Sequence, residues 1–97
     1  MKLEIRWSPN SEITFDAIYH FILEQWSFEI AEELRLKIYN VLDKISIHPF
    51  LFQESPIRNV RKEVISKYTS LFYEVFENHI FLVFFWDNRQ QPFLLNQ

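Results

Sequence analysis

Hydrophobic and polar residues alternate one by one at the start of the chain. Leu3, Ile5 and Trp7 are separated from one another by charged residues. A period of two is typical of a strand that is buried on one side, so we expect a strand over residues 2–7 with these three side chains on its inner face.

Two helices are predicted next, each from a start signal and an apolar stripe. Ser8 can cap a helix whose first residue is Pro9, Ser27 can cap the second helix, and His48-Pro49 ends it. The apolar side chains recur at spacings of three and four, as on a helix packed against a core. The expected stripes are Phe15, Ile18, Tyr19, Ile22 and Trp26 in the first helix and Ile30, Leu34, Ile38, Val41, Leu42 and Ile45 in the second.

The last part of the chain changes to β-branched and aromatic runs, after a proline-containing loop over residues 50–59. The predicted strands are Val60–Ser66, Ser70–Phe76 and Ile80–Trp86. Their connections, Lys67–Thr69 and Glu77–His79, are short enough for hairpins. Because the chain has no glycine, Asn78 is the residue expected to adopt a left-handed turn conformation.

This order predicts one α+β domain over residues 1–97: an N-terminal strand, a helical hairpin, then three antiparallel strands, in two layers. A hydrophobic fraction of 48% in 97 residues supplies one core. The segment Met1 to Trp7 lacks the pattern of a signal peptide, and the apolar run Ile80–Trp86 is far shorter than the roughly 20 residues of a membrane span. With no cysteine, the chain is expected in the cytoplasm, away from membranes.

Charge and motifs exclude several functions. A net charge of −3 disfavours a generally basic nucleic-acid binder. The sequence has no phosphate-binding glycine loop, no zinc-protease motif and no cysteine nucleophile. Its three histidines, His20, His48 and His79, lie far apart, so we expect neither a metal nor a cofactor.

Basic residues of the strand region are the best candidates for chemistry. Arg61 and Lys62 lie on the first of the three late strands, and Arg89 follows the last one. Antiparallel pairing would bring Arg89 close to the turn at Tyr68, where with Arg61 it could bind an anion. In the alternative, Arg61 and Lys62 are solvated edge charges and Arg89 pairs with Asp87 or with Glu63.

The chain resembles a known family in the order and spacing of several short segments. They are Trp7-Ser8-Pro9, His48-Pro49, Val60-Arg61-Lys62, Tyr73-Glu74-Val75 and the close Phe85-Trp86-Asp87-Asn88-Arg89-Gln90-Gln91-Pro92. Together they resemble the RelE/ParE toxins of type II toxin–antitoxin systems, over nearly the whole chain. The resemblance implies a cytoplasmic toxin that inhibits growth and belongs to a module of the kind that stabilises plasmids. It also implies a cognate antitoxin as partner, and no sequence-specific DNA binding by this chain alone.

The resemblance leaves the target open between DNA gyrase, as for ParE-like members, and the ribosome with its mRNA, as for RelE-like endoribonucleases. In the nuclease reading Arg89, Arg61 and Lys62 would be the catalytic residues. Acidic Glu63 stands where the family has the second member of a basic pair, which weakens the nuclease interpretation. Two further departures favour a ParE-like or weakened toxin: Ser70 stands where the family usually has an arginine, and the sequence pI near 5.5 is acidic. Aromatic side chains such as Phe72, Phe76, Phe81 and Trp86 are candidate anchors for a partner.

Overall fold

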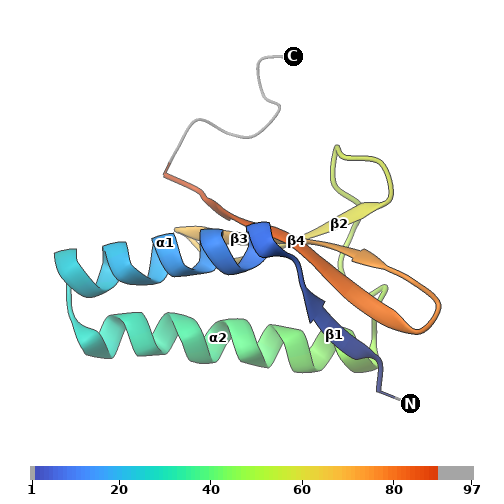
Figure 1. The fold of residues 1–97 in the computed structure, drawn as a ribbon, viewed down its shortest axis with the longest axis horizontal. Coiled ribbons are helices and arrows are strands. Elements are labelled where there is room, and N and C mark those ends of the chain that lie inside the picture. The colour runs from blue at the N-terminus through green and yellow to red at the C-terminus, as the bar shows by residue number, and fades with distance from the viewer. Residues whose placement is uncertain (1, 90–97) are drawn as a thin grey trace.

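Two helices pack against one face of a four-stranded sheet (Figure 1). The computed structural model describes residues 2–89. The elements are β1 (Glu4–Trp7), α1 (Pro9–Gln25), α2 (Phe28–Ile47), β2 (Val60–Ser66), β3 (Thr69–Val75) and β4 (His79–Asp87). The predicted α+β order is confirmed, with strand and helix boundaries that differ from the prediction by a few residues at most.

The sheet is mixed, with the strand order β1-β4-β3-β2. β2, β3 and β4 form an antiparallel meander, whereas β1 pairs in parallel with β4, for example Trp7 with Leu82. A parallel neighbour requires a long crossover, and the helical hairpin between β1 and β2 is part of that connection. The last strand of the sequence therefore lies inside the sheet, between β1 and β3.

Both helices begin at the predicted caps. The Ser8 hydroxyl accepts a hydrogen bond from the Ser11 N–H at 2.9 Å, and the Ser27 hydroxyl accepts one from the Ile30 N–H at 3.1 Å. Each serine thereby satisfies a backbone donor of the first helical turn. α2 ends at Ile47 with His48 as its C-terminal cap, as predicted.

The core lies between the helices and the inner face of the sheet. Its fully buried side chains include Ile38 and Ile45 of α2 and Leu71, Tyr73 and Ile80 of the sheet. The partly buried side chains Ile5 and Trp7 of β1, and Leu3 just before it, also pack against this core, as predicted.

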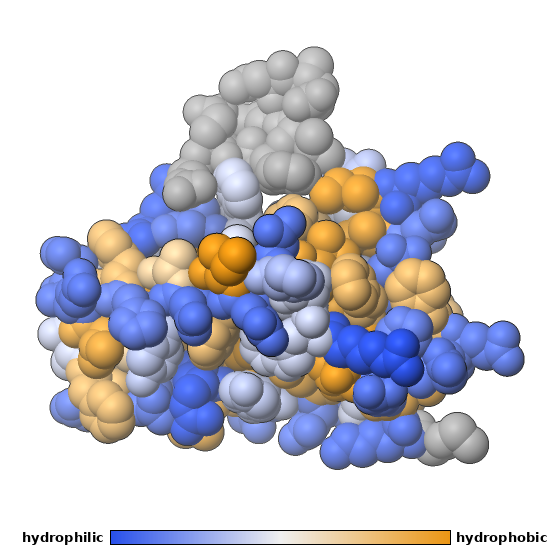
Figure 2. All heavy atoms as spheres, in the orientation of Figure 1, coloured by the Kyte–Doolittle hydropathy of each residue, from blue (hydrophilic) through white to orange (hydrophobic). Residues whose placement is uncertain are grey.

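Two residues of the predicted stripes are exposed. Trp26 is 53% exposed and Ile30 is 38% exposed. α1 ends at Gln25, so Trp26 has left the helix and its side chain no longer follows the stripe. Both residues lie at the tip of the helical hairpin, where Figure 2 shows apolar atoms reaching the surface at the left.

The left-handed residue is Asn59, with φ of 66°, and not Asn78 as predicted. Asn78 lies in a three-residue connection between β3 and β4, closed by a hydrogen bond from the Phe76 N–H to the His79 carbonyl. No residue of this connection has a positive φ, so the turn forms without a left-handed residue. Asn59 instead directs the chain into β2.

The loop before β2 folds back along the edge of that strand. The Lys62 N–H donates to the Gln53 carbonyl at 3.1 Å, and the Ser55 N–H donates to the Val60 carbonyl at 2.8 Å. An edge strand exposes unpaired backbone groups, and the loop satisfies those at the start of β2. Figure 1 shows this loop projecting beyond β2.

Candidate functional site

The site begins where β4 ends, beside the turn between β2 and β3. The Asn88 N–H donates a hydrogen bond of 2.7 Å to the Tyr68 carbonyl, which fixes the two segments against each other. Arg89 follows directly. The prediction that Arg89 approaches the turn at Tyr68 is confirmed, since its guanidinium carbon lies 5.9 Å from the centre of the Tyr68 ring.

The guanidinium of Arg89 is already occupied by groups of this chain. Its Nε donates to Asp87 Oδ1 at 2.9 Å, and its terminal nitrogen pairs with the other carboxylate oxygen. The Arg89 guanidinium carbon also lies 3.9 Å from the centre of the Phe21 ring on α1. The hydrogen bond from Arg89 lowers the pKa of Asp87, and the same bond raises the pKa of Arg89. The positive charge of Arg89 is therefore largely neutralised, as predicted by the alternative in which Arg89 pairs with Asp87.

Arg61 lies on the helix-facing side of β2, opposite Tyr73. Its guanidinium donates to the Phe52 carbonyl at 2.7 Å, and its central carbon lies 4.8 Å from the centre of the Phe50 ring. Both partners belong to the loop before β2. Arg61 thus anchors that loop to the strand.

Lys62 points to the other side of the sheet, because neighbouring strand residues alternate between faces. It lies opposite Phe72, with its Nζ 5.6 Å from the centre of that ring. Ser70, at the position where the family usually has an arginine, lies on this face too. Its buried hydroxyl donates to the Asn88 side-chain oxygen at 3.0 Å.

The structure therefore does not bring the three predicted site residues together. Arg61 and Arg89 share the helix-facing side, but Arg61 pairs with Tyr73 whereas Asp87 pairs with Thr69. Tyr73 and Thr69 are four residues apart on β3, which corresponds to roughly 13 Å along the strand at about 3.3 Å per residue. The predicted single anion-binding surface of Arg61 and Arg89 is absent from the described residues.

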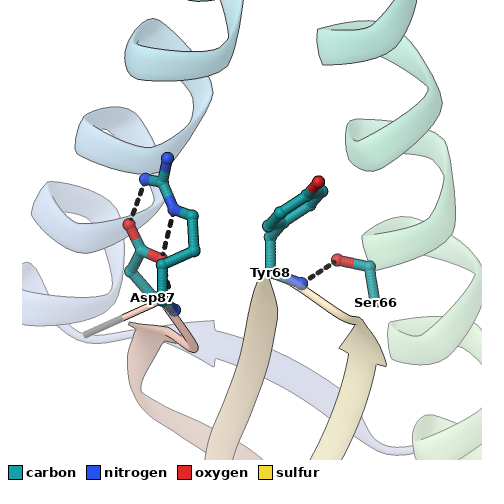
Figure 3. A network of polar contacts seen from close by, with 4 residues as sticks. Ser66, Tyr68 and Asp87 are labelled. Carbon is teal, nitrogen blue, oxygen red and sulfur yellow. Dashed lines mark hydrogen bonds and ion pairs between the residues drawn. The ribbon is translucent and has the colours of Figure 1, made fainter. Parts of the chain in front are cut away.

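Tyr68 instead lies at the centre of a hollowed surface between the helices and the sheet. Figure 3 shows its ring rising between the two helices, with Asp87 on the α1 side and Ser66 on the α2 side. On the α2 side is a groove of about 330 Å³, which we call the Tyr68 groove. It is lined by Ile22, Ile30, Leu34, Lys37, Ser66, Lys67 and Tyr68.

A second hollow, of about 390 Å³, lies on the α1 side of Arg89. Phe21 and Phe85 contribute to its apolar lining, together with Asp87 and Arg89. A narrow cavity of about 20 Å³, bordered by Trp26, Tyr68 and Arg89 among others, lies between the two. The whole surface is thus mainly apolar, with a few charged groups at its margins.

Sequence reasoning singled out Arg89 and its approach to the turn at Tyr68, but missed Phe21 and Trp26 as its surroundings. Phe21 and Trp26 read as ordinary helical apolar residues, and only the packing of α1 over the end of β4 places them here. Tyr68 carried a weak signal of its own, because a large aromatic residue in a short hairpin connection has no core to fill.

The four aromatic side chains predicted to anchor a partner differ in their exposure. Phe72 is buried, at 2% exposure, and its ring packs against that of Phe84 at a tilt of 33°, with centres 4.8 Å apart. Phe81 and Trp86 are half-buried, whereas Phe76 is 42% exposed. Phe76 is the anchor candidate that stays accessible.

Residues 2–89 contain no cluster of three or more histidine, aspartate or glutamate side chains able to hold a metal ion. Within the same range no helix is long and apolar enough to cross a membrane. Gln90, Gln91 and Pro92, which belong to the motif at the close of the chain, lie outside the described residues.

The sequence matches no protein-family model and no curated protein. Its fold, however, matches solved structures. One chain of the chromosomal ParDE toxin–antitoxin system from P. aeruginosa superposes with a TM-score of 0.75 at 16% identity, over 89% of this chain and 96% of that one. YoeB from Staphylococcus aureus, solved as a dimer, gives a TM-score of 0.60 at 20% identity, over 87% and 94% of the two chains.

The conserved hypothetical protein HP0894 from Helicobacter pylori gives a TM-score of 0.60 at 14% identity, covering 91% of this chain and 97% of that chain. With identities this low, the comparisons define the class of fold. The chain has the RelE/ParE-like α+β fold, as its sequence resemblance predicted.

Proposed function

We propose that this chain is the toxin of a type II toxin–antitoxin module, neutralised by a cognate antitoxin, and that it acts in the ParE-like manner by binding DNA gyrase and inhibiting replication. The RelE/ParE-like fold over most of the chain supports the toxin role. Binding to a target needs a surface, and no reacting group.

One observation carries the choice of target. The three cations that a nuclease of this fold would use, Arg61, Lys62 and Arg89, lie in three separate places, and Arg89 is already paired with Asp87. Cleavage of a phosphodiester requires charged groups preorganised around one phosphate. Here Ser70 also supplies only a hydroxyl that is bonded to Asn88.

The second candidate is a RelE-like, ribosome-dependent mRNA endoribonuclease. In its favour, the Arg89 side chain is 36% exposed, so a phosphate could reach it by displacing Asp87. In that case Arg89, Arg61 and Lys62 would carry the catalysis.

Pulse labelling of DNA and protein synthesis in the minutes after induction of this chain alone tests the proposal. We expect DNA synthesis to fall first, and purified gyrase to lose supercoiling activity in its presence. An early fall in protein synthesis with cleaved messages, abolished by Arg89→Ala but not by the control Arg58→Ala in an exposed loop, would establish the nuclease instead. No fall in either would mean a weakened toxin.

A further inference from the structure

Three aromatic side chains from three different elements border a hollow beside the start of α1. Trp7 ends β1, Phe15 lies on α1 and Tyr39 lies on α2, and Figure 1 shows these elements side by side. The hollow has a volume of about 360 Å³ and is lined by Trp7, Glu12, Phe15, Asp16 and Tyr39. We call it the Trp7 hollow, and its lining residues are different from those of the Tyr68 groove.

The aromatic rings of the hollow hold one another at fixed angles. The Phe15 ring stands at 84° to that of Trp7 with centres 5.6 Å apart, and the Tyr39 ring is tilted by 39° from Trp7 with centres 6.2 Å apart. Trp7 and Phe15 also pack against Phe85 of the core. The faces of such rings carry partial negative charge and attract cations. Because these walls exist before a ligand arrives, binding costs little ordering.

Two carboxylates stand at the same hollow. Glu12 and Asp16 are four residues apart on α1, which puts both on one side of the helix, roughly 6 Å apart along its axis. Both residues are exposed, and within residues 2–89 neither forms an ion pair. Aromatic rings and carboxylates in one place favour the same kind of ligand, an organic cation.

One arginine of the chain lies near the hollow but is held by another carboxylate. The guanidinium carbon of Arg35 is 5.9 Å from the centre of the Tyr39 ring, and its terminal nitrogen pairs with Glu32 at 2.8 Å. Glu32 also accepts a hydrogen bond from the Tyr19 hydroxyl. The Tyr39 ring thus has a cation beside it, whereas the cation that would pair with Glu12 and Asp16 has to come from another molecule.

We propose that the Trp7 hollow binds an arginine side chain of a partner protein. A guanidinium is planar, stacks on aromatic faces and forms paired hydrogen bonds with carboxylates, whereas the lysine ammonium is a compact, strongly hydrated charge. A net charge of −3 on the whole chain also favours a basic partner.

The shape of the hollow fits a side chain better than a free small molecule. Its volume of about 360 Å³ is at the low end for ligand pockets. Tyr39 is 45% exposed, so the hollow is open to solvent and admits the end of a side chain that stays attached to a larger surface. None of the lining residues belongs to the site around Arg89, so arginine binding here is independent of the target of the toxin.

Titration of the full chain with blocked tripeptides, followed by NMR at the indole N–H signal of Trp7, tests the proposal. The probes are acetyl-Gly-Arg-Gly-amide, its lysine counterpart, and its citrulline counterpart, which keeps the shape of arginine without the charge. We expect the arginine peptide to bind with a Kd on the order of 1 mM. The other two should bind at least about fivefold more weakly, and salt should weaken the binding of the arginine peptide.

Replacement of single residues identifies the groups that bind. Glu12→Gln and Asp16→Asn should each raise Kd about fivefold, and Tyr39→Ala about threefold, because each removes one attraction to the guanidinium. The matched control is Glu24→Gln, which removes an exposed carboxylate of the same helix outside the hollow and should change Kd by less than about 1.5-fold. Thermal unfolding of each variant separates lost binding from lost folding, since all four replaced residues are exposed.

Three results would overturn the proposal. The first is the lack of a saturable shift at Trp7 with the arginine peptide up to about twenty times the expected Kd. The second is a Kd that Glu12→Gln and Asp16→Asn leave unchanged, or that Glu24→Gln raises equally. The third is tighter binding of tetramethylammonium than of the arginine peptide, which would assign the hollow to a small quaternary amine. Growth arrest on induction tests the toxin function separately, so either can fail while the other stands.

Discussion

The side chain of Arg89 contacts several groups of its own chain, unlike a cation that is free on the surface. Asp87 binds it through two nitrogens and Phe21 lies under its guanidinium, so three segments of the fold meet at one side chain. Arg61 behaves similarly with Phe52 and Phe50. At the residue scale, the two arginines that stand out in the sequence both hold structural segments together.

The contact of Arg89 with Phe21 should be measurable as a coupling energy. Arg89→Ala and Phe21→Ala are each expected to lower the free energy of unfolding, and a double-mutant cycle in urea should give a coupling of about 0.5–1 kcal/mol. The pair Arg35 and Tyr39, whose guanidinium carbon and ring centre are 5.9 Å apart, is the control and should couple less. Additive effects at Arg89 and Phe21 would mean that the stacking contributes nothing to stability.

The two helix caps differ in what they connect. Among residues 2–89, the Ser27 hydroxyl bonds within the start of α2, whereas the Ser8 hydroxyl also donates to the Val83 carbonyl of β4 at 2.9 Å. Val83 lies where the pairing of β3 and β4 shifts register. At the element scale, Ser8 therefore ties the start of α1 to the irregularity of the neighbouring strand.

Ser8→Ala is expected to lower the free energy of unfolding by about 2 kcal/mol, because it removes a cap and leaves a half-buried carbonyl without its donor. Ser27→Ala, the matched control, should cost only about 1 kcal/mol, since its cap is exposed. Urea unfolding of both variants measures the difference. Equal losses would show that the bond to Val83 adds no stability.

The whole molecule depends on the layer of side chains between the helices and the sheet. Tyr73 is a fully buried member of it, and its hydroxyl donates to the Pro49 carbonyl at 3.2 Å, joining β3 to the loop after α2. Burial raises the pKa of Tyr73 to about 12. The folded protein therefore favours the neutral phenol more strongly than the unfolded chain does.

This predicts a loss of stability in alkali. The contribution of Tyr73 is complete below the pKa of an unfolded tyrosine, about 10, and disappears as the pH rises towards 12, by up to about 3 kcal/mol. Tyr73→Phe should unfold more easily at neutral pH, by about 1 kcal/mol, and lose less further stability above pH 10. The half-exposed control Tyr39→Phe should follow the wild-type pH curve. An identical alkaline slope in Tyr73→Phe would contradict the prediction.

Local patterns were sufficient for the elements of this fold. Alternation placed β1, serines at Ser8 and Ser27 placed both helix starts, and runs of β-branched and aromatic residues placed the three later strands. These features depend on neighbours in the sequence, so the sequence determines them directly. The expected α+β order of elements followed from them, whereas the RelE/ParE-like fold class was implied by the resemblance of several short segments.

The tertiary structure decided which elements meet. Nothing in the sequence states that β1 pairs in parallel with β4, and this pairing places β4 inside the sheet. The end of β4 then lies under α1, where the guanidinium of Arg89 packs on the ring of Phe21. Arg61 and Lys62, as neighbours on β2, lie on opposite faces of the sheet. Residue types and local spacing were enough to identify these cations as candidates. Their separation and the groove beside Tyr68 arise from long-range packing, because only packing sets the distances between segments far apart in the chain.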